Sequence, residues 1–412
     1  MNTRRKDSKD MLVDEKTGVQ IEQWKIAPHV VELEASIIRE ILKISSQPGV
    51  ISFAGGLPAP ELFPMHDLQL AMEEVVKKHG AVAFQYSFSR GVPPLRELLA
   101  QWATDRGTAS HVDNILVTAG AQQAIELVAR AFVDRGDYII TEYPTYVGAL
   151  QAFNYYQARY ATVEMDSEGM IIEQARKKIR EYKPKLIYTV SNFQNPTGIT
   201  MSEKRRVELV ELAAECNIPI IDDNPYGDIR FAGRDVPSLK EIGGDRVITL
   251  RSFSKIIAPG LRLGWMNGPT QIMNYFEKVK QCTDLHTNTL CQYIIYEYVS
   301  SGKLREHIET IIKDYRAKRD LMVQTMREHF PEGIKWTEPE GGLFLWVELP
   351  EHVSAKDLLP KAVEMKVAYV YGEPFFPDGQ GHNTLRLNFS NATPDNIVEG
   401  IKRLARLLAD SL

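Results

Sequence analysis

The feature that most constrains the fold of this chain is an alternation of short apolar runs and amphipathic stretches that starts at about residue 114. Residues 121–133 and 203–216 carry apolar side chains at helical spacing. Runs rich in β-branched residues, each long enough for one buried strand, occur at 114–118, 138–141, 186–190, 218–221, 247–250 and 261–265. This alternation predicts an α/β fold with a largely parallel sheet covered by helices on both faces.

Residues from about 300 onward mix long helices with fewer strands, which predicts a second, smaller α+β domain. The segment 49–53 is expected to belong with it. With 412 residues, of which 44% are hydrophobic and 25% charged, the chain can bury two such cores. The domain division that we predict is a polar arm at 1–25, the start of the small domain with a mobile helix at 26–65, a large domain at 66–305 and the small C-terminal domain at 306–412.

The charge and the cysteines exclude several classes of protein. A formal net charge of -5 gives no long-range attraction to nucleic acid or to membrane phosphate. No apolar run reaches the ~20 residues of a membrane span, and the first residues lack an apolar secretory core. The three cysteines form no CxxC pair, which predicts no metal site and suits a reducing cytoplasm.

Chemically active side chains follow five consecutive predicted strands, at the edge of the sheet where ligands bind in such folds. Gly120 opens a helix there, so its free backbone N–H groups and the helix dipole suit an anion. Ser252, Ser254 and Arg262 add hydroxyl and guanidinium donors for phosphate oxygens. The five segments are 120–123, 142–146, 191–198, 222–226 and 252–255.

The remaining groups at this edge complete one ligand. Tyr146 offers a flat face and Asp223 a carboxylate, while Asn195 and Tyr226 offer neutral hydrogen-bond donors and Lys255 an amine. An aromatic ring that carries a phosphate, a basic nitrogen, a phenolic oxygen and an aldehyde would use all of them. That molecule is pyridoxal 5'-phosphate.

The motifs that carry these residues resemble those of fold-type I aminotransferases that depend on pyridoxal phosphate. These motifs are Asn-Pro-Thr-Gly at 195–198, Asp-Asn-Pro-Tyr at 223–226 and Ser-Phe-Ser-Lys at 252–255 with Arg262 after it. The segments 52–64 and 340–346 resemble the 2-aminoadipate and kynurenine aminotransferase branch. The likeness runs from about Ala35 to the C-terminus.

The resemblance implies a role for each residue of the cofactor site. Lys255 would hold the cofactor as a Schiff base and move a proton at the substrate α-carbon, which requires a neutral amine near pH 7. Asp223 would pair with the pyridine nitrogen, Tyr146 would stack on the ring, and Asn195 and Tyr226 would bond the phenolic oxygen.

The phosphate would lie among Gly120, Ala121, Gln122, Ser252, Ser254 and Arg262. Tyr86 matches a tyrosine that the family donates to the phosphate of a partner subunit, which implies a homodimer with shared sites. The chain departs from the family at Ala121, where serine is common, so one hydroxyl is missing. Arg90 stands where an acidic or neutral residue is more usual, and the sequence offers no physical reason for it.

The same resemblance describes the substrate site. Arg386 would grip the α-carboxylate as a bidentate pair, with Asn195 and the Gly56 backbone beside it. Ser36 and Arg39 match a mobile N-terminal helix, whose arginine would meet a distal carboxylate. These residues imply transfer of an amino group from 2-aminoadipate, glutamate, or an aromatic or branched-chain amino acid to 2-oxoglutarate, by a ping-pong mechanism.

Other interpretations stay open at this stage. A decarboxylase, a racemase or a C–S lyase of the same fold would keep Lys255, Asp223 and Arg262. A regulator that senses the cofactor would carry a winged-helix domain ahead of this fold, whereas only about 35 residues precede the first matching motif. A binding protein without catalysis is disfavoured because no catalytic position is lost. Taken singly, each of these residues could have an ordinary structural role in place of a role in the cofactor site. The Gln122 amide and the Ser254 hydroxyl could contact backbone and not the phosphate.

Overall fold

The computed structural model describes residues 25–31, 33, 37, 41, 43 and 47–411. The chain separates into two units, 1–35 and 36–412. In the first, the described residues include one short helix, α1 (Pro28–Val31). Most of the predicted arm, together with Ser36 and Arg39, lies outside the described residues. Within the described ranges, no helix is long and apolar enough to cross a membrane.

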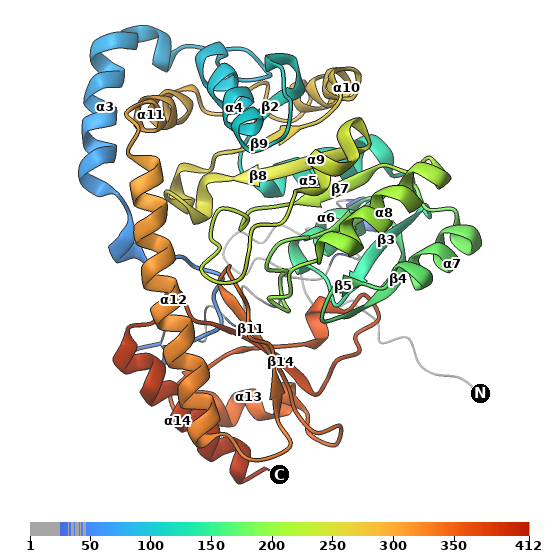
Figure 1. Ribbon diagram of the computed structural model, residues 1–412, viewed down its shortest axis with the longest axis vertical. Coiled ribbons are helices and arrows are strands. Elements are labelled where there is room, and N and C mark those ends of the chain that lie inside the picture. The colour runs from blue at the N-terminus through green and yellow to red at the C-terminus, as the bar shows by residue number, and fades with distance from the viewer. Residues whose placement is uncertain are drawn as a thin grey trace. The chain divides into compact units, whose positions relative to one another are not determined.

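The second unit is built around an eight-stranded sheet with the order β2-β9-β8-β7-β6-β3-β4-β5 (Figure 1). The strands β4, β3, β6, β7 and β8 run parallel, and β9 is antiparallel to both of its neighbours. The bounds are β2 (Ile115–Thr118), β3 (Tyr138–Tyr143), β4 (Arg159–Asp166), β5 (Gly169–Met170), β6 (Ile187–Thr189), β7 (Ile220–Asp223), β8 (Val247–Ser252) and β9 (Gly264–Asn267). The predicted, mostly parallel sheet is confirmed.

Each face of this sheet has its own hydrophobic core, because successive side chains of a strand point to opposite faces. In β6, Tyr188 packs with α5 (Ala121–Phe132) and α6 (Val147–Tyr155) in the larger core. Ile187 packs with the helices on the other face in the smaller core. Those helices are α7 (Ile172–Tyr182), α8 (Glu203–Cys216) and α9 (Leu239–Gly243). The sheet is therefore covered on both faces, as the alternation predicts.

The C-terminal part forms the smaller α+β region. A four-stranded antiparallel sheet has the order β10-β11-β14-β13, and β1 (Ile51–Ser52) pairs in parallel with β12 (Val367–Ala368). The early segment therefore joins this region, as expected. The strands of the sheet are β10 (Lys335–Trp336), β11 (Phe344–Glu348), β13 (Val370–Tyr371) and β14 (Thr384–Asn388). The helices here are α12 (Leu304–His329), α13 (Ala355–Glu364) and α14 (Pro394–Ala409).

Further helices of the large region are α3 (Met65–His79), α4 (Pro93–Asp105), α10 (Thr270–Gln281) and α11 (Thr289–Ser300). The helices α3 and α11 pack against each other, and α10 packs on α5. The long helix α12 begins at the predicted division near residue 305 and continues into the C-terminal region. The exact domain division therefore stays a prediction.

The structure differs from the strand predictions in two places. The strand predicted at 261–265 begins only at Gly264, because Pro259–Leu261 form a 3₁₀ turn and Arg262 has a left-handed φ of 48°. The strands β4 and β5 lie in a stretch for which no strand was predicted. In β4, Ala161 and Val163 are buried while both end residues are exposed, so its apolar pattern is short.

Candidate active site

Lys255 ends a 3₁₀ turn directly after β8, at the carboxyl edge of the sheet. Its side chain is half-buried, and Nζ donates a hydrogen bond to the carbonyl oxygen of Gly56 at 2.7 Å. Burial, together with the nearby guanidinium groups of Arg386 and Arg262, lowers the pKa of Lys255 to about 8. The amine is therefore poised to lose its proton close to neutral pH.

Asp223 ends β7 and is almost fully buried. Its Oδ2 accepts a hydrogen bond from the Tyr188 hydroxyl at 2.7 Å, whereas Oδ1 has no hydrogen-bond partner among the described residues. Burial and the neighbouring carboxylate of Asp222 raise the pKa of Asp223 to about 7. A buried carboxylate oxygen without a partner is costly, so a ligand N–H at this place would be stabilised strongly.

Tyr188 is a functional residue that the sequence analysis missed. It was assigned only to a strand, although its hydroxyl fixes the orientation of the Asp223 carboxylate. The available signal was a tyrosine in an otherwise apolar strand, because a buried tyrosine hydroxyl usually needs a hydrogen-bond partner.

Arg386 lies in β14 and is buried. One guanidinium nitrogen donates to Asn195 Oδ1 at 2.8 Å and another to the Ala54 carbonyl at 2.9 Å, while Nε has no partner among the described residues. The guanidinium lies 4.1 Å from the centre of the Phe344 ring. Burial lowers the pKa of Arg386 to about 10, so the group stays cationic at neutral pH. Within the part of the chain that the structure describes, it pairs with no carboxylate, which leaves a buried positive charge available for a ligand anion.

The turn that presents Asn195 is held by a buried network. Gln194 Nε2 donates to Glu142 Oε2 at 3.1 Å, and Gln194 Oε1 accepts from the backbone N–H and the hydroxyl of Thr197 at 2.9 and 2.7 Å. Burial raises the pKa of Glu142 to about 7. Burial also raises the pKa of Tyr226, and the side chain of Asn195 beside it partly offsets that rise. Asn195, Tyr226 and Arg386 therefore form one cluster.

The start of α5 forms a cradle that suits an anion. Gly120 precedes the helix with a φ of 82°, a conformation that favours glycine, and a Cβ there would lie 2.8 Å from an Arg262 nitrogen and displace that guanidinium. Arg262 is exposed and donates to the carbonyls of Ala119 and Pro259 at 3.2 and 3.5 Å. Ser252 pairs with Gly264 across β8 and β9, and a Cβ on Gly264 would touch Gly120 at 2.9 Å. The anion cradle is defined here as Ala119, Gly120, Ala121, Ser252 and Arg262.

Three predicted residues lie around this cradle with other contacts. The Gln122 side-chain Nε2 donates to the Gly148 carbonyl at 2.7 Å. This contact agrees with the alternative that the Gln122 amide bonds to backbone and not to a phosphate. The Ser254 backbone N–H donates to Ser252 Oγ at 3.1 Å. The Tyr146 hydroxyl contacts Gln122 Oε1 at 3.5 Å, and burial with Asp223 nearby raises the pKa of Tyr146 to about 12.

Tyr86 lies away from these groups in its own chain. Its side chain is 79% exposed and meets the His286 ring edge-on at 5.8 Å between ring centres. The distal-carboxylate prediction for Arg39, and that for Ser36, fall on residues outside the described ranges.

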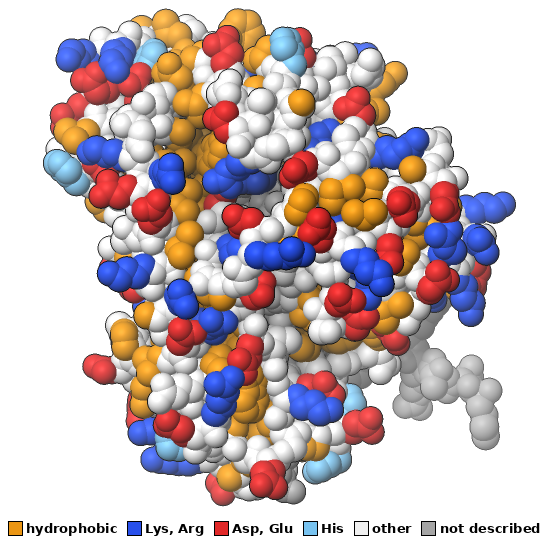
Figure 2. All heavy atoms as spheres, in the orientation of Figure 1, with side chains coloured by type: hydrophobic (Ala, Val, Ile, Leu, Met, Phe, Trp, Pro, Cys, Tyr) orange, Lys and Arg blue, Asp and Glu red, His pale blue; other side chains and the backbone are white. Residues whose placement is uncertain are grey.

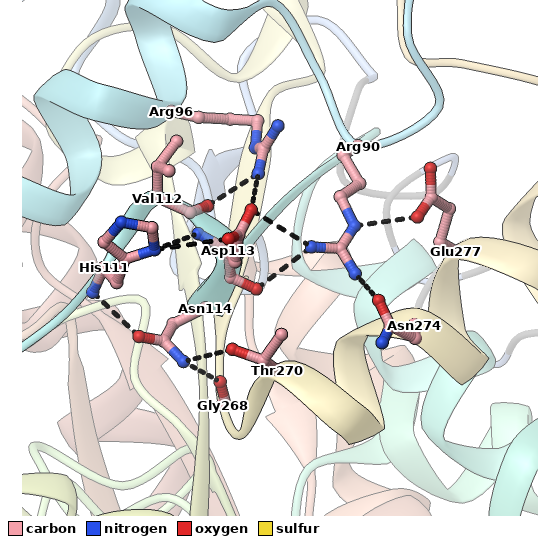
Figure 3. A network of polar contacts seen from close by, with 10 residues as sticks. All are labelled: Arg90, Arg96, His111, Val112, Asp113, Asn114, Gly268, Thr270, Asn274 and Glu277. Carbon is pink, nitrogen blue, oxygen red and sulfur yellow. Dashed lines mark hydrogen bonds and ion pairs between the residues drawn. The ribbon is translucent and has the colours of Figure 1, made fainter.

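Arg90, which the sequence left unexplained, has a structural role (Figure 3). The side chain is buried and donates to Glu277 Oε2 at 2.8 Å, to the Asp113 carbonyl at 3.1 Å and to Asn274 Oδ1. Glu277 and Asn274 belong to α10. Arg90 therefore fastens the segment that follows Tyr86 to that helix.

A separate groove of about 1400 Å³ lies on the other side of the same strands, toward the viewer in Figure 2. Thr249 and Arg251 of β8 line it, whereas Ser252 belongs to the cradle, because successive side chains of a strand point to opposite faces. The residues that line the groove include neither Lys255 nor Arg386. The groove is therefore distinct from the cluster around Lys255.

The cluster fits pyridoxal 5'-phosphate on four observations. The orphaned Asp223 Oδ1 suits a protonated ring nitrogen, and the half-buried Lys255 amine suits an aldehyde. The glycine at the helix start and the exposed Arg262, which donates to backbone carbonyls, suit a phosphate. Ala121 adds no hydroxyl, so at that position only the backbone can contribute.

Comparison with known proteins gives the same assignment. A model of the family described as aminotransferase class I and II matches residues 61–404. The chain is 45% identical over 388 residues to "Aromatic-amino-acid aminotransferase 1" of Thermococcus litoralis, covering 92% of this chain and 93% of that protein.

Two solved structures are similar along almost their whole length. Kynurenine aminotransferase of Pyrococcus horikoshii is 42% identical, with a TM-score of 0.91 and coverage of 95% of this chain and 98% of that one. The α-aminoadipate aminotransferase of Thermus thermophilus, complexed with N-(5'-phosphopyridoxyl)-L-leucine, is 35% identical, with a TM-score of 0.88 and coverage of 93% and 97%. The chain therefore belongs to the aminotransferase class I and II family, and it is a pyridoxal 5'-phosphate-dependent aminotransferase.

Proposed function

We propose that this enzyme transfers the amino group of a 2-amino acid to 2-oxoglutarate by a ping-pong mechanism, with the first product leaving before the second substrate binds. The observation that carries the proposal is the buried guanidinium of Arg386, whose hydrogen-bond partners are both neutral, close to the Lys255 amine. An α-carboxylate bound there would hold a substrate amino group near Lys255.

The residues divide the chemistry among them. Bound pyridoxal 5'-phosphate supplies an aldehyde and a pyridine ring that withdraws electrons from the substrate α-carbon. Asp223 Oδ1 would accept a hydrogen bond from the ring nitrogen and keep it protonated. Asn195 and Tyr226 would bond the phenolic oxygen, and Tyr146 would stack on the ring.

Lys255 Nζ moves the proton. With its pKa lowered to about 8, a usable fraction of the amine is neutral at pH 7, so Nζ can take the proton from the substrate α-carbon and return it to another atom. Gly56 offers its carbonyl oxygen to Nζ at 2.7 Å, which keeps the amine oriented in the site.

The substrates that we propose are 2-aminoadipate and glutamate, with aromatic and branched-chain amino acids as further donors. The names of the similar proteins support this range, since they are an aromatic-amino-acid, a kynurenine and an α-aminoadipate aminotransferase. Arg39 is the residue that we expect to meet a distal carboxylate.

We also propose that the enzyme is a cytoplasmic homodimer in which Tyr86 reaches the phosphate of the partner subunit. Four alternate residues before α4 expose large apolar side chains, which a monomer rarely presents to water. They are Val82, Phe84, Tyr86 and Phe88, with exposed fractions of 61%, 67%, 79% and 64%.

A single-turnover experiment tests the reaction type. Protein loaded with cofactor is mixed with 2-aminoadipate, glutamate, phenylalanine or leucine and no acceptor. Transamination releases one equivalent of 2-oxo acid per protomer and stops. With 2-aminoadipate, phenylalanine or leucine, turnover resumes only after 2-oxoglutarate is added, whereas glutamate, whose product is 2-oxoglutarate, is followed in the first phase alone. Continuous turnover without an acceptor, with release of CO₂ or formation of the opposite enantiomer, would contradict the proposal. Lys255→Ala is expected to abolish both phases.

A further inference from the structure

An ion pair between a buried lysine and a partly exposed aspartate lies beside the anion cradle, near the C-terminal end of α10. Lys280 has a fully buried side chain, and its Nζ lies 2.6 and 2.7 Å from the two carboxylate oxygens of Asp284. Burial of the Lys280 ammonium carries a desolvation cost, which the hydrogen bonds around it offset.

Gln123 joins this pair to the cradle. Its Nε2 donates to Asp284 Oδ2 at 2.7 Å, and its Oε1 accepts from Lys280 Nζ at 3.3 Å. The same Oε1 accepts the backbone N–H of Ala119 at 2.7 Å. The Ala119 carbonyl in turn accepts from Arg262 at 3.2 Å. Ala119, the residue that begins the cradle, is thus bound at its backbone N–H by Gln123 of this network and at its carbonyl by Arg262.

We propose that Gln123, Lys280 and Asp284 are positioning residues for the phosphate of the cofactor. They touch neither substrate nor cofactor, and they act by fixing the 119–120 backbone and the Arg262 guanidinium in the geometry that a phosphate requires. The proposal rests on the cradle being the phosphate site, as the proposed function has it.

This network matters more here because of Ala121. Without a hydroxyl at that position, phosphate binding depends on backbone N–H groups whose direction is set by the chain that precedes α5. The Ala119 N–H donates to the Gln123 amide oxygen, and the charged groups of Lys280 and Asp284 hold that amide in place through charge-assisted hydrogen bonds.

The test compares two cofactors that differ only in the phosphate. Apoprotein is titrated with pyridoxal 5'-phosphate and with pyridoxal, and binding is followed by visible absorbance. Gln123→Leu leaves the Lys280–Asp284 pair intact and removes the acceptor of the Ala119 N–H. It is expected to weaken binding of the phosphorylated form about tenfold, the order expected for the loss of one hydrogen bond, and to leave binding of pyridoxal unchanged. The quantity compared is the ratio of the affinity for pyridoxal 5'-phosphate to the affinity for pyridoxal. The Lys280→Met/Asp284→Leu double variant should also lower this ratio.

Two controls make the outcome decisive. Lys318→Met removes another buried lysine, which pairs with Glu61 and Asp314 at 3.0 and 2.9 Å in a different part of the molecule, so it should leave the ratio unchanged. Arg262→Gln should lower the ratio if the cradle is the phosphate site. An unchanged ratio in Gln123→Leu, or an equal loss for both cofactors, would overturn the positioning role, whereas an unchanged ratio in Arg262→Gln would overturn the cradle assignment itself. If the double variant does not fold, Gln123→Leu alone decides.

Discussion

At the scale of single residues, the site is marked by groups whose charges have no opposite charge beside them. Arg386 and Arg262 bond only to neutral acceptors among the described residues, and Lys255 lies close to both. Asp223 keeps one buried oxygen without a partner in the same part of the chain. A protein uses such arrangements where a ligand completes the interactions, because unpaired buried charges cost stability.

The lowered pKa of Lys255 gives a pH prediction. The pKa falls from 10.5 to about 8, so the neutral fraction of the amine should rise about tenfold with each pH unit up to pH 8 and level off above it. The initial rate at which apoprotein captures pyridoxal, read from visible absorbance, should follow this curve. Lys255→Ala provides the blank. A rate that still rises steeply between about pH 9 and 10 would show an amine with its ordinary pKa.

The same shift affects stability. Since the folded pKa lies below the unfolded value, the unfolded apoprotein binds the extra proton between pH 8 and 10.5. The contribution of this one group to the free energy of unfolding therefore rises with pH across that window.

Residue types were predictable from the sequence, but their environments were not. The motifs brought Lys255, Asp223 and Asn195 together because strand ends of a parallel sheet share one edge. The hydroxyl of Tyr188 on Asp223 depends on which face of β6 it occupies, and the partners of Arg90 come from segments far away in the sequence. Such contacts follow from the folded register and not from any local pattern.

At the scale of elements, Arg90 fastens the segment between α3 and α4 to α10 and to the Asp113 backbone (Figure 3). Arg90→Ala should lower the free energy of unfolding by roughly 2 kcal/mol, because Glu277, Asn274 and the Asp113 carbonyl all lose their hydrogen-bond donor. Arg90→Lys should restore little, since an ammonium cannot reproduce the planar fork. Denaturant unfolding measures both.

The control for this prediction is Arg305→Ala. Arg305 is 90% exposed and pairs with Glu309 one turn along α12, so its removal should change stability little. An Arg90→Lys variant as stable as the wild-type protein would contradict the role given to the guanidinium.

At this scale, the start of one strand was misplaced because a backbone feature overrides the apolar pattern. Residues 261–265 are apolar enough for a strand, yet the left-handed φ of Arg262 delays β9 until Gly264. That turn is what directs the Arg262 guanidinium back toward Ala119. The deviation from the expected element is thus part of the site.

At the scale of the whole molecule, the proposed dimer predicts linked losses. Phe84→Asp combined with Phe88→Asp should give a monomer by sedimentation, and its affinity for the cofactor should fall because Tyr86 no longer reaches a partner phosphate. The Tyr86→Phe variant should remain a dimer, and only its affinity for the cofactor should fall. Val207→Asp, on α8 and also exposed, should leave both properties unchanged. A double variant that remains dimeric would show that this segment lies outside the interface.

The bare charge of Arg386 has a consequence for which amines the enzyme can admit. A monoamine or diamine carries an ammonium group and no carboxylate, so it would bring a second positive charge into a low-dielectric site that already holds one. A zwitterionic amino acid arrives with the opposite charge on the correct carbon. Biogenic amines and polyamines should therefore be poor inhibitors even at high concentration. The enzyme discriminates against them when they bind, before any chemical step.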